Sequence, residues 1–379
     1  MILGIDAFNL RRGGGVTHLV ELLRSVKPHD YGFERIVVWG SNEILLKIDE
    51  RDWLDKSPQP LLEKGLLFRV FWQRFLARKL ARQKGCDIVF VPGGANASGF
   101  KPVVTMCRNM LPFEWKEMRR YGYSLITFKL LLLRFAQIQA FIKADGLIFL
   151  TNYAEKKVMR VLGNRELKTA TIPHGISTRF FHPPKIELEK KFNNENPYKL
   201  LYVSIISPYK HQWVVAEACA KLRAKNIPLH LDLIGPADTG IDLLQHKIEM
   251  LDPGGSFISY YGSVPYEKLE EYYNAADIGV FASSCENMPN ILLEGMAAGL
   301  PMACSSMGPM PEILKDAGVY FNPLDANDVA QALLKLISST NLRKKLASTG
   351  FKYAEQYSWE RCANETFNFL ADVANSQTR

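Results

Sequence analysis

The stretch Ser283-Ser284-Cys285-Glu286-Asn287-Met288-Pro289-Asn290-Ile291-Leu292-Leu293-Glu294 joins a predicted strand to a predicted helix. The apolar run before it, at residues 277–282, is typical of a buried parallel strand. Pro289 favours a helix start and Gly299 a helix end, so we expect a short helix at residues 291–298. This order of elements predicts a parallel α/β sheet that binds ligands at the carboxyl ends of its strands.

Two carboxylates of this stretch are expected at the same sheet edge. Glu286 lies on the loop above the strand end, and Glu294 lies in the first helical turn. Carboxylates accept hydrogen bonds from vicinal hydroxyls, and backbone amides at a helix N-terminus suit sugar hydroxyls or phosphate. Either glutamate alone would be an ordinary loop acid or a partner of the helix dipole. Together they predict a site for a polyhydroxylated, phosphorylated ligand, completed by Asn287, Met288, Pro289 and Asn290.

The spacing of Glu286 and Glu294 resembles the E-x7-E signature of retaining glycosyltransferases of the GT-B type, in particular family four (GT4) of the group 1 transferases. The segment Gly308-Pro309-Met310-Pro311-Glu312 is similar to the bacterial surface-polysaccharide members of that family. The resemblance is strongest at residues 199–359 and continues more weakly back to Met1. It implies transfer of a hexose from a nucleotide-diphosphate sugar with retention of configuration.

Strand and helix patterns alternate in both halves of the chain, which predicts an α/β fold of two doubly wound, Rossmann-like domains facing a cleft. We expect an N-terminal acceptor domain at residues 1–175, a linker at 176–198 and a C-terminal nucleotide-sugar donor domain at 199–357. The resemblance implies that residues 358–379 form a helix that crosses back to the N-terminal domain. An apolar helix is expected at residues 125–142, buried in the core.

The composition is that of a globular protein, with 379 residues, enough for two ordinary domains, and 47% hydrophobic residues. Its six cysteines lack C-x-x-C or cysteine–histidine spacing, so neither a zinc site nor a disulfide framework is expected. The first residues lack a signal-peptide pattern, and the apolar runs are interrupted before membrane-spanning length. We therefore expect a cytoplasmic protein.

Positive charge is concentrated in one part of the chain, whose net charge is +8. Residues 64–84 contain seven basic residues and no acidic one, interleaved with leucine, phenylalanine and tryptophan. Such a basic amphipathic stretch is typical of a helix on an anionic membrane surface, and a basic cluster at 115–121 adds to it. A core helix with a solvated face is the alternative. The sequence lacks a nucleic-acid-binding motif, so no nucleic-acid partner is expected.

Two further segments extend the predicted site. In Gly13-Gly14-Gly15, which follows the first strand, Gly14 and Gly15 would aim backbone amides at a phosphate. Lys210 follows the first strand of the donor domain and supplies a cation. The resemblance implies that Lys210 grips the diphosphate together with an arginine five positions earlier, where this chain has Ile205. The two-cation clamp is therefore incomplete, and backbone amides or another cation must assist Lys210.

The resemblance also places Gly262 and Val264 beside the nucleobase. Related enzymes carry a histidine near the transferred sugar at the place where this chain has Arg108-Asn109, so Asn109 or Arg108 would substitute for it. His174 matches a frequent family histidine at the domain junction, where a structural role is the alternative to a catalytic one.

The sequence lacks an Asp-x-Asp pair, which favours transfer without a metal ion or other cofactor. The resemblance implies that Glu294 binds ribose hydroxyls, that Glu286 binds sugar hydroxyls, and that transfer occurs at the front face, with the departing phosphate taking the acceptor proton. It further implies a lipid-linked saccharide acceptor and a peripheral location at the inner face of the cytoplasmic membrane. UDP-glucose or a related UDP-hexose is the expected donor, with GDP-mannose second. A sugar-nucleotide epimerase and a non-catalytic scaffold of the same fold are the alternatives.

Overall fold

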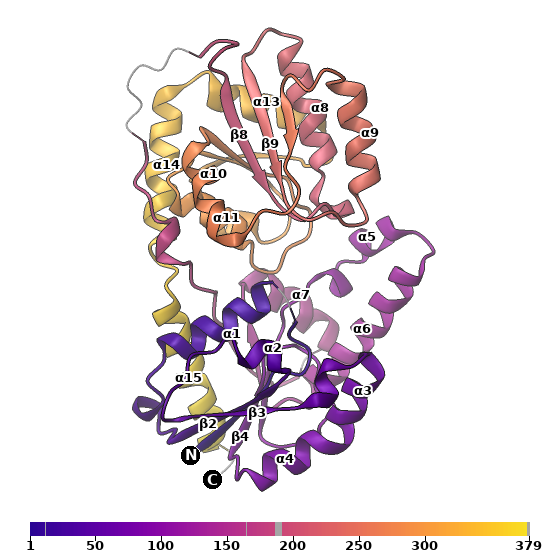
Figure 1. Ribbon diagram of the computed structural model, residues 1–379, viewed down its shortest axis with the longest axis vertical. Coiled ribbons are helices and arrows are strands. Elements are labelled where there is room, and N and C mark those ends of the chain that lie inside the picture. The colour runs from indigo at the N-terminus through magenta and orange to yellow at the C-terminus, as the bar shows by residue number, and fades with distance from the viewer. Residues whose placement is uncertain (12, 164, 186–191, 377–379) are drawn as a thin grey trace. The chain divides into compact units, whose positions relative to one another are not determined.

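The computed structural model describes residues 1–11, 13–163, 165–185 and 192–376. The chain separates into two compact units (Figure 1). Unit 1 consists of Met1–Phe113, Tyr123–Gly175 and Ser358–Arg379, and unit 2 consists of Glu114–Gly122 and Ile176–Tyr357. Residues 186–191 of the predicted linker and 377–379 of the predicted crossing helix lie outside the described residues.

Unit 1 is built on a parallel sheet. Its strands are β1 (Ile2–Asp6), β2 (Arg35–Gly40), β3 (Leu54–Pro58), β4 (Ile88–Val91), β5 (Val103–Met106), β6 (Gly146–Phe149) and β7 (Lys168–Thr171). They lie in the order β3-β2-β1-β4-β5-β6-β7, and every neighbouring pair is parallel. All residues of β4, β5 and β6 are buried, as expected for a sheet that is covered on both faces.

The helices of unit 1 are α1 (Gly14–Ser25), α2 (Asn42–Leu45), α3 (Leu66–Phe71), α4 (Ala77–Gln83), α6 (Leu125–Lys143), α7 (Asn152–Leu162) and α15 (Trp359–Ser376). A π-helical segment at Trp72–Leu76 joins α3 to α4. Helix α15 packs on α1 and on β6. A Cβ atom added at Gly146 would lie only 2.9 Å from Val373 of α15, so this glycine lets the last helix rest directly on the sheet.

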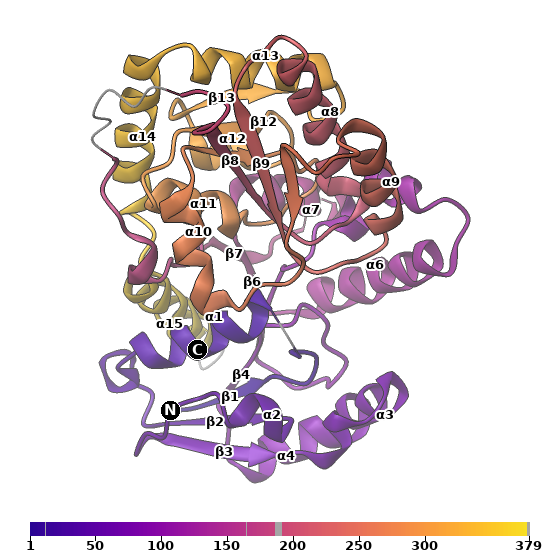
Figure 2. The same cartoon turned by 45° about the horizontal axis from the view of Figure 1, so that its top comes forward.

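Unit 2 is built on a second parallel sheet. Its strands are β8 (Tyr198–Val203), β9 (Leu229–Ile234), β10 (Ile258–Tyr260), β11 (Ile278–Phe281), β12 (Met302–Ser305) and β13 (Gly318–Phe321), in the order β10-β9-β8-β11-β12-β13. Its helices are α5 (Trp115–Met118), α8 (Gln212–Arg223), α9 (Ile241–Leu251), α10 (Leu269–Ala275), α11 (Asn290–Ala297), α12 (Met310–Leu314), α13 (Ala326–Ile337) and α14 (Thr340–Ala354). Helix α8 packs with α9 and α13, and α11 packs with α14 (Figure 2).

The connection after β8 lies close against the end of β9. At Gly235 the φ angle is 150°, and an added Cβ would lie 1.9 Å from the backbone oxygen of Ser204. Only glycine tolerates this approach. The contact fixes the loop that leads from β8 to Lys210, at the carboxyl edge of the sheet where ligands of α/β proteins bind.

The helix expected at residues 125–142 is present as α6, but the prediction that it is buried is wrong. Its buried residues are Leu130, Gln137, Ala140 and Phe141. With 19 residues and a mean hydropathy of 1.6 in its most apolar window, α6 is also long and apolar enough to cross a membrane by length and composition alone, although Lys129 and Arg134 interrupt its apolar run. Six of its large apolar side chains are exposed: Leu125, Ile126, Phe128, Leu131, Leu132 and Phe135.

Candidate active site

The loop that carries Glu286 joins two adjacent elements of unit 2. Strand β11 ends at Phe281 and helix α11 begins at Asn290, so the predicted order of strand, loop and helix is confirmed. The loop is buried against the protein, with Met288 only 8% exposed. Gly308 lies beside it, because a Cβ at that position would be 3.9 Å from the Glu286 backbone nitrogen. The loop backbone is therefore held by neighbouring segments.

Lys210 and Glu286 form an ion pair within unit 2. Their side chains are 8% and 15% exposed, so most of the pair is removed from water. Lys210 ends a short turn after β8, and its backbone oxygen accepts a 2.6 Å hydrogen bond from the Tyr202 hydroxyl. Its ammonium group lies over the aromatic rings of Tyr209 and Phe281, 5.3 and 5.5 Å from their centroids. The structure thus joins two predicted site residues that are far apart in sequence.

Glu294 lies inside unit 2 and is held by two tyrosines. Tyr266 donates a hydrogen bond to one carboxylate oxygen and Tyr273 donates to the other, each at 3.1 Å. Burial raises the pKa of Glu294 to about 7, while the two tyrosine hydroxyls and the nearby Arg179 oppose part of that rise. Each carboxylate oxygen has a second lone pair and can still accept a hydroxyl from a ligand.

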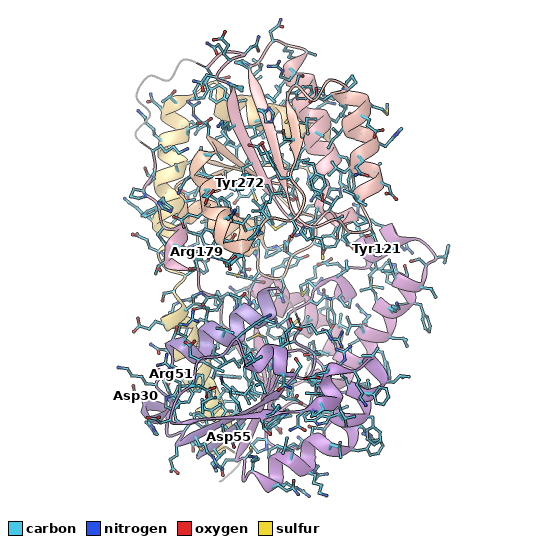
Figure 3. The ribbon with its side chains drawn as sticks, in the orientation of Figure 1. Asp30, Arg51, Asp55, Tyr121, Arg179 and Tyr272 are labelled. Atoms are coloured by element: carbon cyan, nitrogen blue, oxygen red, sulfur yellow. The ribbon has the colours of Figure 1, made fainter. Side chains whose placement is uncertain are left out.

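Arg179 reinforces this corner of unit 2 (Figure 3). Its guanidinium lies 4.0 Å from the ring centroid of Tyr266 and 4.8 Å from that of Phe180, which is itself fully buried. Arg179 and Phe180 belong to the segment 176–198 that was predicted as a linker, and in the structure they are part of unit 2. Tyr266, Tyr273 and Arg179 were all missed by sequence reasoning. The signal for Tyr266 is its place directly after the loop that contains Gly262 and Val264.

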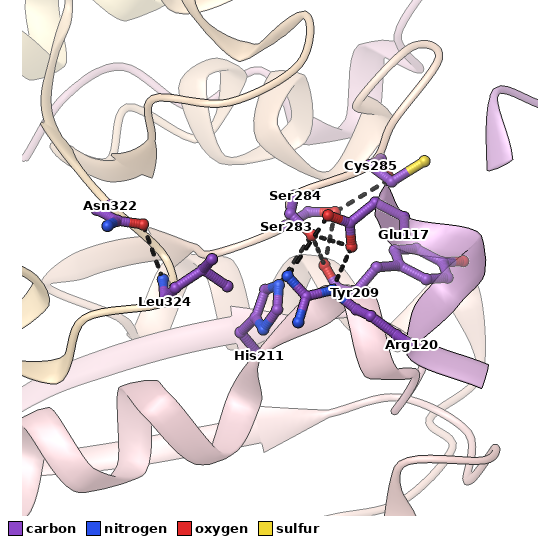
Figure 4. A network of polar contacts seen from close by, with 9 residues as sticks. All are labelled: Glu117, Arg120, Tyr209, His211, Ser283, Ser284, Cys285, Asn322 and Leu324. Atoms are coloured by element: carbon purple, nitrogen blue, oxygen red, sulfur yellow. Dashed lines mark hydrogen bonds and ion pairs between the residues drawn. The ribbon is translucent and has the colours of Figure 1, made fainter. Parts of the chain in front are cut away.

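A second polar network holds the start of the Glu286 loop (Figure 4). The Ser284 hydroxyl bonds to His211 Nε2 at 2.8 Å and donates to a carboxylate oxygen of Glu117 at 2.7 Å. Glu117 also accepts from the Arg120 guanidinium at 2.6 Å. Burial, together with the charge of Arg120, lowers the pKa of His211 to about 3, so its imidazole is neutral near pH 7. No spacing pattern in the sequence connects these residues.

Cys285 shares this loop, but burial and the neighbouring carboxylates raise the pKa of its thiol well above the ordinary value. It remains a thiol near neutral pH, so nothing in its surroundings makes it a nucleophile.

The other predicted residues of unit 2 surround this loop or lie on neighbouring ones. Asn287 and Pro289 are buried in the loop, and Asn290 opens α11 with a buried side-chain oxygen that has no partner among the residues described. Gly262 and Val264 follow β10, the edge strand, where the Gly262 backbone oxygen accepts a 2.8 Å hydrogen bond from Gly235.

Ile205 occupies the position of the missing arginine, in the loop after β8. Its side chain is 37% exposed. At this position the loop therefore carries an exposed apolar side chain rather than a second cation.

The remaining predicted residues, Gly14, Gly15 and Asn109, belong to unit 1. Gly14 and Gly15 open α1, and Gly13 before them has a φ of 71°, with no atom of the described residues within 4 Å of the position of an added Cβ. The Asn109 side chain accepts a 3.0 Å hydrogen bond from the Leu111 backbone, so it caps its own turn. This use of its oxygen does not favour a direct role on the sugar.

Arg108 lies beneath the start of α1. A Cβ at Gly15 would be 3.7 Å from the central carbon of its guanidinium. Its Nη1 is buried without a hydrogen-bond partner, and the described residues place no carboxylate in an ion pair with it. Burial lowers the pKa of Arg108 to about 10, which still leaves it charged near pH 7. A half-buried guanidinium with an unpartnered Nη1, lying below a glycine-rich helix start, is suited to an anion.

His174 lies in unit 1 beside His18, with ring centroids 4.5 Å apart, and close to the ring of Trp359. The possible metal-ligating atoms of His18, His174 and Cys362 lie within 4.8 Å of one another, and all three residues are buried. Burial lowers the pKa of both histidines well below 6.5, and the charge of Arg108 lowers it further. The same charge would repel a metal cation, so this packing favours the structural role for His174.

Residues 185–353 match the family model described as Glycosyl transferases group 1. Over 112 residues the chain is 34% identical to O-antigen chain mannosyltransferase B of Escherichia coli, a match that covers 30% of this chain and 29% of that protein. The chain spans about half the length of other curated relatives that it matches.

Two solved structures are similar along the whole chain. Sucrose-phosphate synthase from Thermosynechococcus elongatus superposes with a TM-score of 0.77 at 15% identity, covering 99% of this chain and all of that one. HepE from Anabaena, in complex with UDP-glucose, superposes with a TM-score of 0.69 at 16% identity, covering 100% and 99%. At these identities the likeness establishes the fold. The chain therefore has the GT-B fold, and its residues 185–353 match the glycosyl transferases group 1 family model.

Proposed function

We propose that the protein is a retaining glycosyltransferase that moves a hexose from a nucleotide-diphosphate sugar to a saccharide acceptor. The observation that carries this proposal is the meeting of Lys210 and Glu286 at the edge of the sheet that also presents Glu294. Strands β8 and β11, which lead to these residues, are neighbours in the sheet. A cation and two carboxylates there match the charges and hydroxyls of a nucleotide-diphosphate sugar.

Glu294 is proposed to bind the ribose. The hydroxyls of Tyr266 and Tyr273 hold one lone pair on each carboxylate oxygen, which fixes the plane of the carboxylate. The two remaining lone pairs then face in fixed directions and can accept the vicinal ribose hydroxyls. A preorganised acceptor of this kind loses little conformational freedom when the donor binds.

Lys210 is proposed to stabilise the leaving diphosphate, and Glu286 to accept hydrogen bonds from the transferred sugar. In the structure these two groups neutralise each other, so the donor would exchange their mutual contact for contacts with phosphate and sugar hydroxyls. In the proposed front-face transfer, the bond from the anomeric carbon to the phosphate oxygen breaks as the bond to the acceptor oxygen forms on the same face. The acceptor proton passes to the departing phosphate, which balances the reaction without an added base.

Arg108 is proposed to bind a phosphate group at the start of α1, within unit 1. The guanidinium lies under Gly15 at the start of α1 and has an unpartnered Nη1. It would act together with the backbone amides of Gly14 and Gly15. This assignment uses Arg108, rather than Asn109, at the place where related enzymes carry a histidine.

For the donor we propose UDP-glucose or a related UDP-hexose first and GDP-mannose second. The similarity to a mannosyltransferase over 112 residues supports the second choice. The lack of an Asp-x-Asp pair supports transfer without a metal ion. The proposed acceptor is a saccharide on a lipid carrier, in cell-surface polysaccharide synthesis of the kind implied by the E. coli relative's name. The protein would then work at the inner face of the cytoplasmic membrane.

Calorimetric titration with UDP, GDP and their sugars, with and without Mg²⁺, tests the proposal. Wild type should bind one nucleotide without Mg²⁺, Glu294→Gln should lose most of that binding, and Glu267→Gln, an exposed glutamate near Tyr266, should keep it. If wild type binds no nucleotide at millimolar concentration, the enzyme proposal fails and a scaffold remains. Conversion of a bound sugar nucleotide without any acceptor would instead identify an epimerase.

A further inference from the structure

Helix α6 exposes apolar side chains along most of its length. Phe128 is 58% exposed, Leu132 55% and Phe135 64%, all within two helical turns. Large side chains of this kind normally form the buried face of a helix, and here they are not covered by the chain. A contiguous exposed apolar face indicates that something outside the protein covers it.

The segment from α3 to α4 repeats this feature. Its exposed apolar residues are Leu66, Leu67, Phe68, Val70, Phe71 and Phe75, with Leu67 83% exposed. The rings of Phe71 and Phe75 lie 5.0 Å apart and form an exposed aromatic pair. The segment is nevertheless anchored, because Trp72 and Gln73 between these residues are buried. Its apolar side chains are thus held out from a fixed helix.

The two elements lie on the same side of unit 1 (Figures 1 and 2). The loop after β4 connects them: Gln73 donates to the backbone oxygen of Ala95 at 3.1 Å and accepts from the Ala97 amide. In the same loop, the position of a Cβ on Gly94 is 3.2 Å from the side-chain nitrogen of Gln137, on α6. We name the exposed apolar residues of α3, of the π-helical segment and of α6 the α3–α6 surface.

The two segments that carry the α3–α6 surface have charges of a single sign. Residues 64–86 contain seven basic residues and no acidic one, and residues 123–144 contain three basic residues and no acidic one. Beside Phe75, a groove of about 600 Å³ is lined by Arg74, Arg78, Lys79 and Arg82. The other parts of the chain contain all 39 of its acidic residues. The absence of acidic residues from these two segments favours an anionic partner, and the exposed apolar side chains favour one with an apolar layer next to its charge.

The packing of α6 restricts how it can meet a membrane. Its Arg134 donates a 2.8 Å hydrogen bond to the backbone oxygen of Pro112, and its Phe141 stacks on Phe113 with ring centroids 6.1 Å apart. Crossing a bilayer would break these contacts and would place Lys129 and Arg134 in the hydrocarbon layer. A helix with one packed face and one exposed apolar face is instead suited to lie in the plane of the interface.

We propose that the α3–α6 surface docks on an anionic phospholipid bilayer, with the α6 face in the acyl boundary and the cations lining the basic groove on lipid phosphates. This proposal rests on the membrane location that is part of the proposed function and names the surface responsible for it, but it depends on no residue of the donor site. The α3–α6 surface includes part of the basic amphipathic stretch at 64–84 and adds a second, predominantly apolar element, α6. The sequence analysis had predicted that α6 lies in the core. The bilayer supplies both properties that the surface requires: negative charge and an apolar layer.

Co-sedimentation with lipid vesicles tests this proposal with the full chain. Wild type should bind vesicles made of about equal parts phosphatidylglycerol and phosphatidylcholine. It should bind much less to vesicles of phosphatidylcholine alone. Leu132→Glu/Phe135→Glu and, separately, Arg78→Glu/Arg82→Glu should each weaken binding about tenfold or more. Leu243→Glu/Met250→Glu on α9, where both side chains are also exposed, is the matched control and should bind as wild type does.

Three outcomes would overturn the proposal. The first is wild-type protein that stays in the supernatant with anionic vesicles, and the second is unchanged binding by both test variants. The third is a concentration-dependent dimer in light scattering that the α6 variant abolishes, because the surface would then belong to a second copy. Nucleotide titration of the same proteins separates this result from the proposed function, since vesicle binding and donor binding use different residues and each can fail alone.

Discussion

Tyr273 and Glu294 form a buried hydrogen bond of 3.1 Å that links α10 to α11, 21 positions apart in the chain. With Tyr266 on the other oxygen, it sets both the direction and the proton affinity of the glutamate. Loss of these donors should raise the pKa of Glu294 further above about 7, because only the charge of Arg179 would then oppose the effect of burial. The Glu294 carboxyl group would then be protonated at neutral pH.

Stability should therefore fall as pH rises through the pKa of Glu294. The folded pKa of about 7 lies above the ordinary value of 4.5, so the folded protein holds this proton more tightly than the unfolded chain. The contribution is complete below pH 4.5 and lost above pH 7, and amounts to roughly 3 kcal/mol. Urea unfolding of wild type and Glu294→Gln across this range measures it. Parallel curves for the two proteins would contradict the prediction.

The Lys210–Glu286 pair should show strong coupling. Removal of one partner, as in Lys210→Met or Glu286→Gln, should lower the free energy of unfolding by roughly 3 kcal/mol, because it leaves a buried charge uncompensated. The double variant should lose less than the sum of the two. The exposed Lys47–Glu43 pair is the control, and its removal should cost under about 0.5 kcal/mol. Additive losses at the first pair would show that the two charges act independently.

Arg108→Met should have opposite effects on stability and on binding. The substitution removes a half-buried cation whose Nη1 is unpartnered and that has no ion-pair carboxylate among the described residues, so the free energy of unfolding should rise. The same change should weaken binding of a nucleoside diphosphate about tenfold, with little effect on the free nucleoside. Thermal unfolding and calorimetry of UDP against uridine, and of GDP against guanosine, measure both. Unchanged diphosphate binding would remove Arg108 from the phosphate site.

Ile205→Arg should restore the second cation beside Lys210. Because the Ile205 side chain is 37% exposed, an arginine there can reach solvent or ligand without burying its charge. Diphosphate affinity should rise about tenfold through one charge-assisted contact. Ile205→Gln, similar in length but uncharged, is the control. Equal affinity in all three proteins would place the diphosphate away from this loop.

Local signals made the core of the site predictable. The strand, loop and helix at residues 277–298 follow from an apolar run, a proline and a glycine, all close together in the chain. Lys210 was found in the same way, because parallel strands end at one sheet edge and the loop after β8 must lie there. Each of these inferences needs only contacts between neighbours in sequence or in the sheet.

The residues that support the site could not be predicted, because their contacts are not between neighbours in sequence or in the sheet. Tyr273 contacts Glu294 from another helix, and Glu117 reaches Ser284 across 167 positions, so no spacing rule joins either pair. The error on α6 has another cause. The sequence argument took apolar residues to be interior residues, but the free energy of burial is equally available from a surface outside the protein.

The position of α15 has a consequence for the order in which the chain matures during synthesis. All of unit 2 lies before residue 358, so it can become compact while the last helix is still being translated. Unit 1 must wait, because Cys362, Phe367, Leu370 and Val373 fill its core beside strands made from the first half of the chain. Unit 1, whose first strands are synthesised before unit 2, therefore completes its folding after unit 2. Until α15 packs, the part of its sheet that α15 covers leaves apolar side chains exposed.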